Sequence, residues 1–120
     1  MPIRRLKSYT AQTGYVYQYY FVGKRPALSD DPEAPATEYI FDVTSDRKTT
    51  FAVSVFLGPE ALKTWSARRG RELSEPEQYA AAKLRLMQGF DEIVDMLHEG
   101  RRLQLDGESL SGLLASIGVD

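Results

Sequence analysis

The sequence predicts an α+β fold, in which an antiparallel sheet of three to four strands carries two main helices packed on one face. Two observations support this prediction. Segments rich in aromatic and β-branched residues dominate the first half of the chain, and such residues favour strands. In the second half, apolar residues recur every three or four positions over a long segment, which is the period of an α-helix.

The long segment, about residues 75–98, is the clearest helix. Ser74 and Glu77 form a capping box, Pro76 lies in the first turn, and Gly100 follows the last periodic residue. We expect this helix to pack its apolar stripe against a sheet or another helix. At about 100° per residue the stripe spans roughly 80° and contains Tyr79, Ala82, Leu86, Phe90, Ile93 and Leu97.

Three segments are predicted as strands, about residues 15–23, 37–45 and 49–57. The first is dense in tyrosine and valine, and both of its faces are at least half apolar, which indicates an internal strand. In the other two, apolar residues alternate with polar ones, as they do in a strand with one buried face. The basic segment 3–11 is a candidate edge strand.

The two alternating strands should form a hairpin. Side chains directly opposite one another share a face of the sheet, so Val43 should pair with Phe51, and Phe41 with Val53. This register requires an odd number of loop residues, most simply residues 46–48. A two-residue turn would place apolar residues against the wrong face.

Two further helices are predicted, one over about residues 59–69 and a short one over about 107–117. The first begins with a proline, and Asp106 precedes the second as its N-cap. Residues 103–105 alternate between leucine and a polar residue in a short extended piece. Residues 24–36 hold three prolines and a run of acids, which predicts a surface loop.

The length of 120 residues predicts one globular domain, residues 1–120. Charge is segregated along the chain: residues 1–25 carry five bases and no acid, whereas residues 26–46 carry six acids and no base. Alternating blocks of this kind are typical of charge pairing within a fold or between copies of it. They favour such pairing, within the fold or between copies, over a nucleic-acid surface.

The chain lacks the residue patterns of known catalytic and metal sites. It contains no cysteine, and His98, its only histidine, is predicted to lie on the surface of the long helix. It has neither a nucleophile-elbow sequence nor a glycine-rich turn that would cradle a phosphate. We therefore expect a protein that is not an enzyme and that uses no cofactor or metal.

No apolar run is long enough to span a bilayer, the longest being residues 51–57. The N-terminal residues carry charges with no apolar segment behind them, so no signal peptide is predicted. We expect no membrane contact and a cytoplasmic location.

The favoured function is a small non-catalytic protein-interaction module that forms a homodimer. Leu84 lies about 160° from Leu86 around the long helix, and Met87 widens the apolar surface towards it. In the alternative arrangement, the C-terminal helix folds back over this flank within one chain. The residues predicted at the dimer contact are Leu84, Met87, Leu110, Leu113, Leu114 and Ile117.

Two other functions remain as alternatives. One is nucleic-acid binding, because aromatic side chains on a sheet beside a basic rim are how single strands are bound. Against it, the same tyrosines can form the core under the long helix, and the pI is near 5.4. The other is a small-molecule pocket between sheet and helices. The residues predicted to contact nucleic acid are Arg4, Arg5, Lys7, Tyr15, Tyr17, Tyr19, Lys24 and Arg25.

Overall fold

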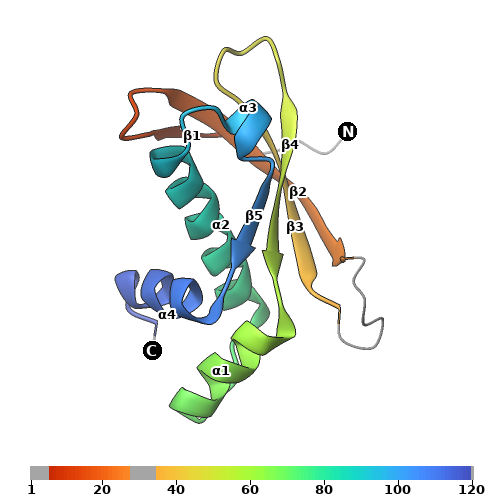
Figure 1. Ribbon diagram of the computed structural model, residues 1–120, viewed down its shortest axis with the longest axis vertical. Helices are drawn as coiled ribbons and strands as arrows, with labels where there is room; N and C mark the ends of the chain where they lie inside the picture. The colour runs from red at the N-terminus through yellow and green to blue at the C-terminus, as the bar shows by residue number, and fades with distance from the viewer. Residues whose placement is uncertain (1–5, 28–34, 120) are drawn as a thin grey trace.

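The computed structural model describes residues 6–27 and 35–119, which form an α+β fold (Figure 1). Its strands make one sheet whose spatial order follows the chain, β1-β2-β3-β4-β5. No helix within these residues is both long and apolar enough to cross a membrane. The elements are β1 (Lys7–Thr10), β2 (Val16–Pro26), β3 (Thr37–Thr44), β4 (Phe51–Leu57), α1 (Pro59–Arg69), α2 (Glu75–Glu92), α3 (Met96–Glu99), β5 (Arg102–Leu105) and α4 (Gly107–Ser116).

The sheet is mixed and five-stranded, which corrects the prediction of a purely antiparallel sheet of three to four strands. Strands β1 to β4 pair antiparallel, and β5 then adds to β4 in parallel. A parallel neighbour requires a crossover connection, supplied here by α1, α2 and α3. The sequence predicted that residues 103–105 are extended. It did not predict which strand they pair with, because a strand as short as β5 carries no pattern that identifies its neighbour.

The hairpin of β3 and β4 has the predicted register, with Val43 opposite Phe51 and Phe41 opposite Val53. Its loop is held by Asp46, whose Oδ1 accepts from the backbone N–H groups of Lys48 and Thr49 at 2.8 Å each. These backbone donors hold the pKa of Asp46 below its ordinary value. The alternating apolar residues of both strands are buried on one face, as the period of two requires.

Strand β2 runs further than predicted, because residues 24–26 belong to it rather than to the surface loop. A bulge between Phe21 and Gly23 shifts its register against β3. The bulge moves Lys24 to the face that carries α2, where its Nζ lies 3.2 Å from Glu75. The edge strand predicted over 3–11 is observed as β1, and residues 28–34 lie outside the described part of the chain.

The N-terminus of α2 is capped as predicted. The Ser74 hydroxyl accepts from the Glu77 backbone N–H, and the Glu77 carboxylate accepts from the Ser74 N–H at 2.9 Å. Pro76 lies in the first turn. The apolar stripe meets the sheet, and Ala82, Leu86 and Phe90 are fully buried.

The helix predicted over 75–98 ends at Glu92, which is a correction. Ile93 adopts an extended conformation, and Asp95 then caps a separate short helix by accepting from the His98 N–H. The interruption lets Met96 turn into the core and brings the chain to β5. Gly100 therefore ends α3 rather than the long helix.

Only α2 covers the sheet, whereas α1 lies beyond the lower end of β4 and packs against α4 (Figure 1). This corrects the prediction that both main helices share one face. The approach of α2 to β5 is close, because a Cβ atom on Gly89 would lie 2.9 Å from Leu103 Cδ1. Gly89 is thus the residue that allows the helix to sit on the fifth strand.

Candidate functional site

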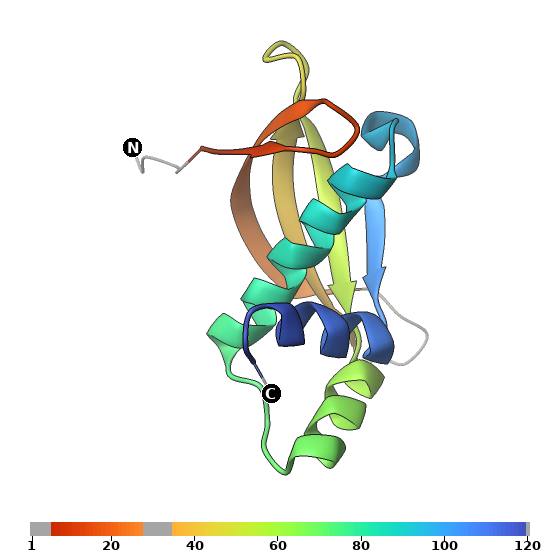
Figure 2. The same ribbon diagram turned by 90° about the vertical axis from the view of Figure 1, so that its left-hand side faces the viewer.

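Three of the predicted interface residues, Leu84, Met87 and Leu113, line a groove of about 490 Å³ beside α2, called here the α2 groove. Leu84 and Met87 of α2 form its floor, Tyr9 of β1 lines one side, and Leu113 of α4 lines the other. Figure 2 shows the backbone around this groove: α2 runs diagonally, with β1 above it and α4 below it. All four side chains are half-buried.

The groove is braced at one end by Asp91. Its Oδ2 accepts from the Tyr9 hydroxyl at 2.7 Å, and its Oδ1 accepts from the Gln12 backbone N–H at 2.9 Å. These two bonds tie the turn between β1 and β2 to the last turns of α2. The bond to Asp91 is also the main reason that the pKa of Tyr9 is raised, so its hydroxyl stays protonated at neutral pH.

Acidic side chains line one end of the groove, and two lysines lie near its other end, outside the lining. Asp91 and the exposed Glu92 lie at one end. Near Leu84, Lys83 lies beside Lys7 of β1, and its pKa is lowered, first by burial and then by the charge of Lys7. Two neighbouring lysines on one surface favour contact with a carboxylate from outside the chain.

Not all of the predicted interface residues are available to a partner. Leu110 and Leu114 are fully buried where α4 packs against α1 and α2, so the fold does not leave these two residues at the surface. The fold-back of the C-terminal helix within one chain accounts for their burial. Leu113 remains in the groove, and Ile117 is exposed one turn further along.

The residues predicted to contact nucleic acid do not form a platform. Tyr17 and Tyr19 are buried against α2, whereas Tyr15 is half exposed at the end of the sheet. Of the bases, Lys7, Lys24 and Arg25 are exposed; Lys24 pairs with Glu75, and Arg25 with Glu38 at 3.0 Å. Arg4 and Arg5 lie outside the described residues.

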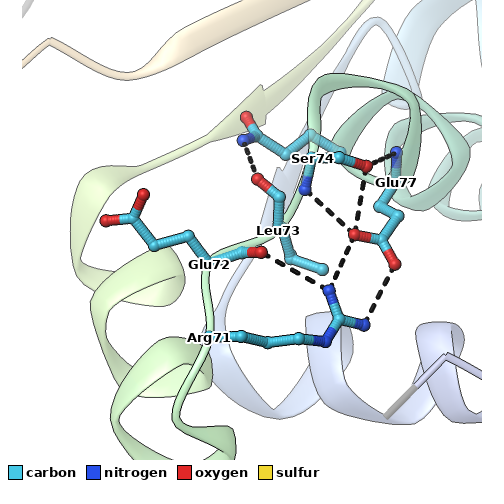
Figure 3. Close-up of polar contacts among 6 residues, drawn as sticks. Arg71, Glu72, Leu73, Ser74 and Glu77 are labelled. Carbon is cyan, nitrogen blue, oxygen red and sulfur yellow. Dashed lines mark hydrogen bonds and ion pairs between the residues drawn. The ribbon is translucent and has the colours of Figure 1, made fainter.

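Basic side chains gather at the C-terminal end of α1, and Arg71, which follows it, supports the capping box (Figure 3). Arg71 holds the Glu77 carboxylate with both terminal nitrogens, at 3.0 and 3.1 Å. This bond is the largest of the causes that lower the pKa of Glu77 to about 2. The guanidinium groups of Arg69 and Arg71 also lie 4.9 Å from the buried Trp65 ring.

A further hollow, called here the three-loop cleft, lies at the end of the sheet that α2 does not reach. Its volume is about 430 Å³, within the range of small-molecule sites. Tyr15 comes from the turn before β2 and Tyr17 from the start of β2. Asp46 comes from the loop between β3 and β4, and Val94 and Asp95 come from the break between α2 and α3. The lining of this cleft was not predicted from the sequence, because the predicted helix continued through residues 93–95.

His98 is exposed, as predicted, and its Nδ1 lies 3.0 Å from Asp95 at the rim of the three-loop cleft. Within residues 6–27 and 35–119, no group of three or more acidic or histidine side chains is arranged to hold a metal ion. Comparisons of the chain with models of known protein families, with curated proteins and with solved structures each found no match.

Proposed function

We propose that the protein is a non-catalytic interaction module that self-associates as a twofold dimer through the α2 groove. The observation that carries this proposal is the meeting of Leu84, Met87 and Leu113 in one open groove. These apolar side chains come from α2 and α4, and the core of their own chain leaves them partly exposed. Apolar grooves with polar rims are typical of protein-binding surfaces.

A second copy fits the charges of the groove. A twofold axis places the same surface on both copies, so a basic end of one must meet an acidic end of the other. Met87 lies midway between Lys83 and Asp91, four residues from each. An antiparallel pair of α2 helices centred on Met87 would therefore bring Lys83 opposite Asp91 of the second copy, about 6 Å along the axis from the centre.

The contact is tested by sedimentation equilibrium of the wild type and of groove variants up to high micromolar concentration. The wild type should be dimeric. Leu84→Glu should weaken the dimer at least about tenfold, because each copy would bury an unpaired carboxylate. Val94→Glu is the matched control, since Val94 is an apolar side chain 64% exposed outside the groove. It should leave the dimer unchanged.

The charge arrangement has its own test. Glu92 is changed in place of its neighbour Asp91, because Asp91 already binds Tyr9 and Gln12. Lys83→Glu and Glu92→Lys should each weaken the dimer, because each brings like charges close together across the axis. The double variant restores opposite charges and should recover most of the affinity. A wild type that stays monomeric at high micromolar concentration would exclude the proposal, as would equal weakening by Leu84→Glu and Val94→Glu.

A further inference from the structure

The three-loop cleft is lined by a tyrosine whose hydroxyl has no hydrogen-bond partner within the described part of the chain. Tyr17 is 2% exposed, and its ring stacks on Phe90 with the centroids 4.2 Å apart. Its hydroxyl has no hydrogen-bond partner among residues 6–27 and 35–119, although the side chain lines the cleft. Because this hydroxyl is not one of the fully enclosed side-chain atoms, it faces the open cleft, where a polar group that enters can form a hydrogen bond with it.

The charged groups that line the cleft are all acidic. Asp46 and Asp95 contribute two carboxylates, and the lining includes no lysine or arginine. Backbone donors hold Asp46 in its ionised form, as its lowered pKa shows. Asp95 also lies near Tyr17, since its charge contributes to the raised pKa of that hydroxyl after burial and Tyr15. Both carboxylates therefore favour a cation.

The rest of the wall is apolar and aromatic. Tyr15 is 48% exposed and offers a ring to the cleft, and Val94, Leu97 and Phe51 add apolar surface. Arg101 of the same chain already lies 5.6 Å from the Phe51 ring, which is a cation held over an aromatic face at this end of the sheet. Four basic side chains lie close in sequence to lining residues but outside the lining itself, namely Arg47, Lys48, His98 and Arg101.

We propose that the three-loop cleft binds a small organic amine in its ammonium form. The Tyr17 hydroxyl oxygen accepts one ammonium N–H, and Asp95 and Asp46 supply the counter-charge. The Tyr15 ring and the neighbouring apolar side chains contact the hydrocarbon part of the amine. This site is independent of the α2 groove, because the lining residues of the two hollows do not overlap.

The test compares phenethylammonium with 2-phenylethanol, a neutral molecule of similar size, by following backbone amide NMR shifts during titration. Phenethylammonium should give saturable shifts at residues 15–17, 45–49 and 94–97. The neutral alcohol should bind at least about tenfold more weakly, because it lacks the charge that the carboxylates require. Equal affinity for the two probes would overturn the proposal, as would shifts confined to other residues or no saturable shift with the amine.

Two conservative variants separate the roles of the lining groups. Tyr17→Phe removes the hydroxyl and keeps the stacked ring, and it should weaken amine binding several-fold. Tyr19→Phe is the matched control, because Tyr19 is buried on the same strand and face but does not line the cleft. Asp95→Asn preserves the cap of α3 and should weaken binding about tenfold. Unchanged affinity in both Tyr17→Phe and Asp95→Asn would refute the assignment.

Discussion

Phe90 is the residue at which the sheet and α2 meet. It is fully buried, stacks on Tyr17, and lies 6.0 Å, between ring centroids, from both Tyr9 and Tyr19. These rings belong to an aromatic cluster that joins three strands to the helix. Its members are Tyr9, Tyr17, Tyr19, Phe21, Tyr39, Phe41, Tyr79 and Phe90.

Replacing Phe90 by alanine should remove much of the stability of the protein. The cavity left among the surrounding rings should lower the free energy of unfolding by about 3–5 kcal/mol. Chemical denaturation measures the change. Phe21→Ala is the control in the same cluster, and because Phe21 is 37% exposed its loss should be smaller. Equal losses at the two positions would show that Phe90 does not hold the centre of the core.

At the scale of elements, the two ends of α2 are determined differently. Local contacts hold its N-terminus, and contacts with distant segments hold its C-terminus. Its first turn is closed by groups that are close in sequence, Ser74, Glu77 and Arg71 (Figure 3). Its last turns are held by distant segments, since Asp91 binds β1 and Gly89 packs against β5. The two ends of one helix thus depend on different kinds of interaction.

The capping box should make the stability of α2 sensitive to acid. The pKa of Glu77 is lowered from 4.5 to about 2, first by the hydrogen bond from Arg71, so the folded state favours the ionised carboxylate. The resulting stabilisation is complete above the unfolded pKa and is lost as the pH falls through the folded one. Glu77→Gln should therefore destabilise the protein at neutral pH, with the difference shrinking between about pH 4.5 and pH 2.

Urea denaturation of the wild type and of Glu77→Gln across this pH range measures the effect. The same substitution in an Arg71→Gln background supplies the control, because the main cause of the lowered pKa is then missing. The loss at neutral pH should be smaller in that background. A difference between wild type and Glu77→Gln that stays constant down to pH 2 would contradict the role given to the ionised carboxylate.

At the scale of the whole molecule, the fold separates two open surfaces. The α2 groove lies between β1 and α4, and the three-loop cleft lies where α2 ends (Figures 1 and 2). The tyrosine face of β2, which the sequence also offered as a binding surface, is mostly enclosed under α2. Of the basic side chains predicted beside this face, Lys24 and Arg25 pair with acids. Lys7 lies beside another lysine, Lys83.

Binding to single-stranded oligonucleotides should therefore be undetectable at physiological salt. Tyr17 and Tyr19 are buried, so their rings cannot stack on bases without displacing α2. Fluorescence anisotropy with labelled mixed-sequence oligonucleotides makes the measurement. Micromolar binding that weakens steeply with salt and falls on replacement of Arg4 and Arg5 would show the opposite. Arginine substitutions are the informative ones, because phosphate contacts carry the salt dependence.

The sequence by itself determined the elements whose signals lie within a few residues of one another. The capping box, the proline at the start of α1 and the cap of α4 are local, and these helix starts were predicted correctly. The register of β3 and β4 was also predicted correctly from the sequence, because a slip of one residue would expose a whole apolar face.

Only the tertiary structure decided where α2 stops, what β5 pairs with and which leucines stay accessible. Each depends on contacts between distant segments, such as Gly89 with Leu103 and Tyr9 with Asp91. Helical periodicity continues through residues 93–97, so the sequence alone does not distinguish a break from a longer helix. That break opens the three-loop cleft, and the packing of α4 buries Leu110 and Leu114 while leaving Leu113 in the groove.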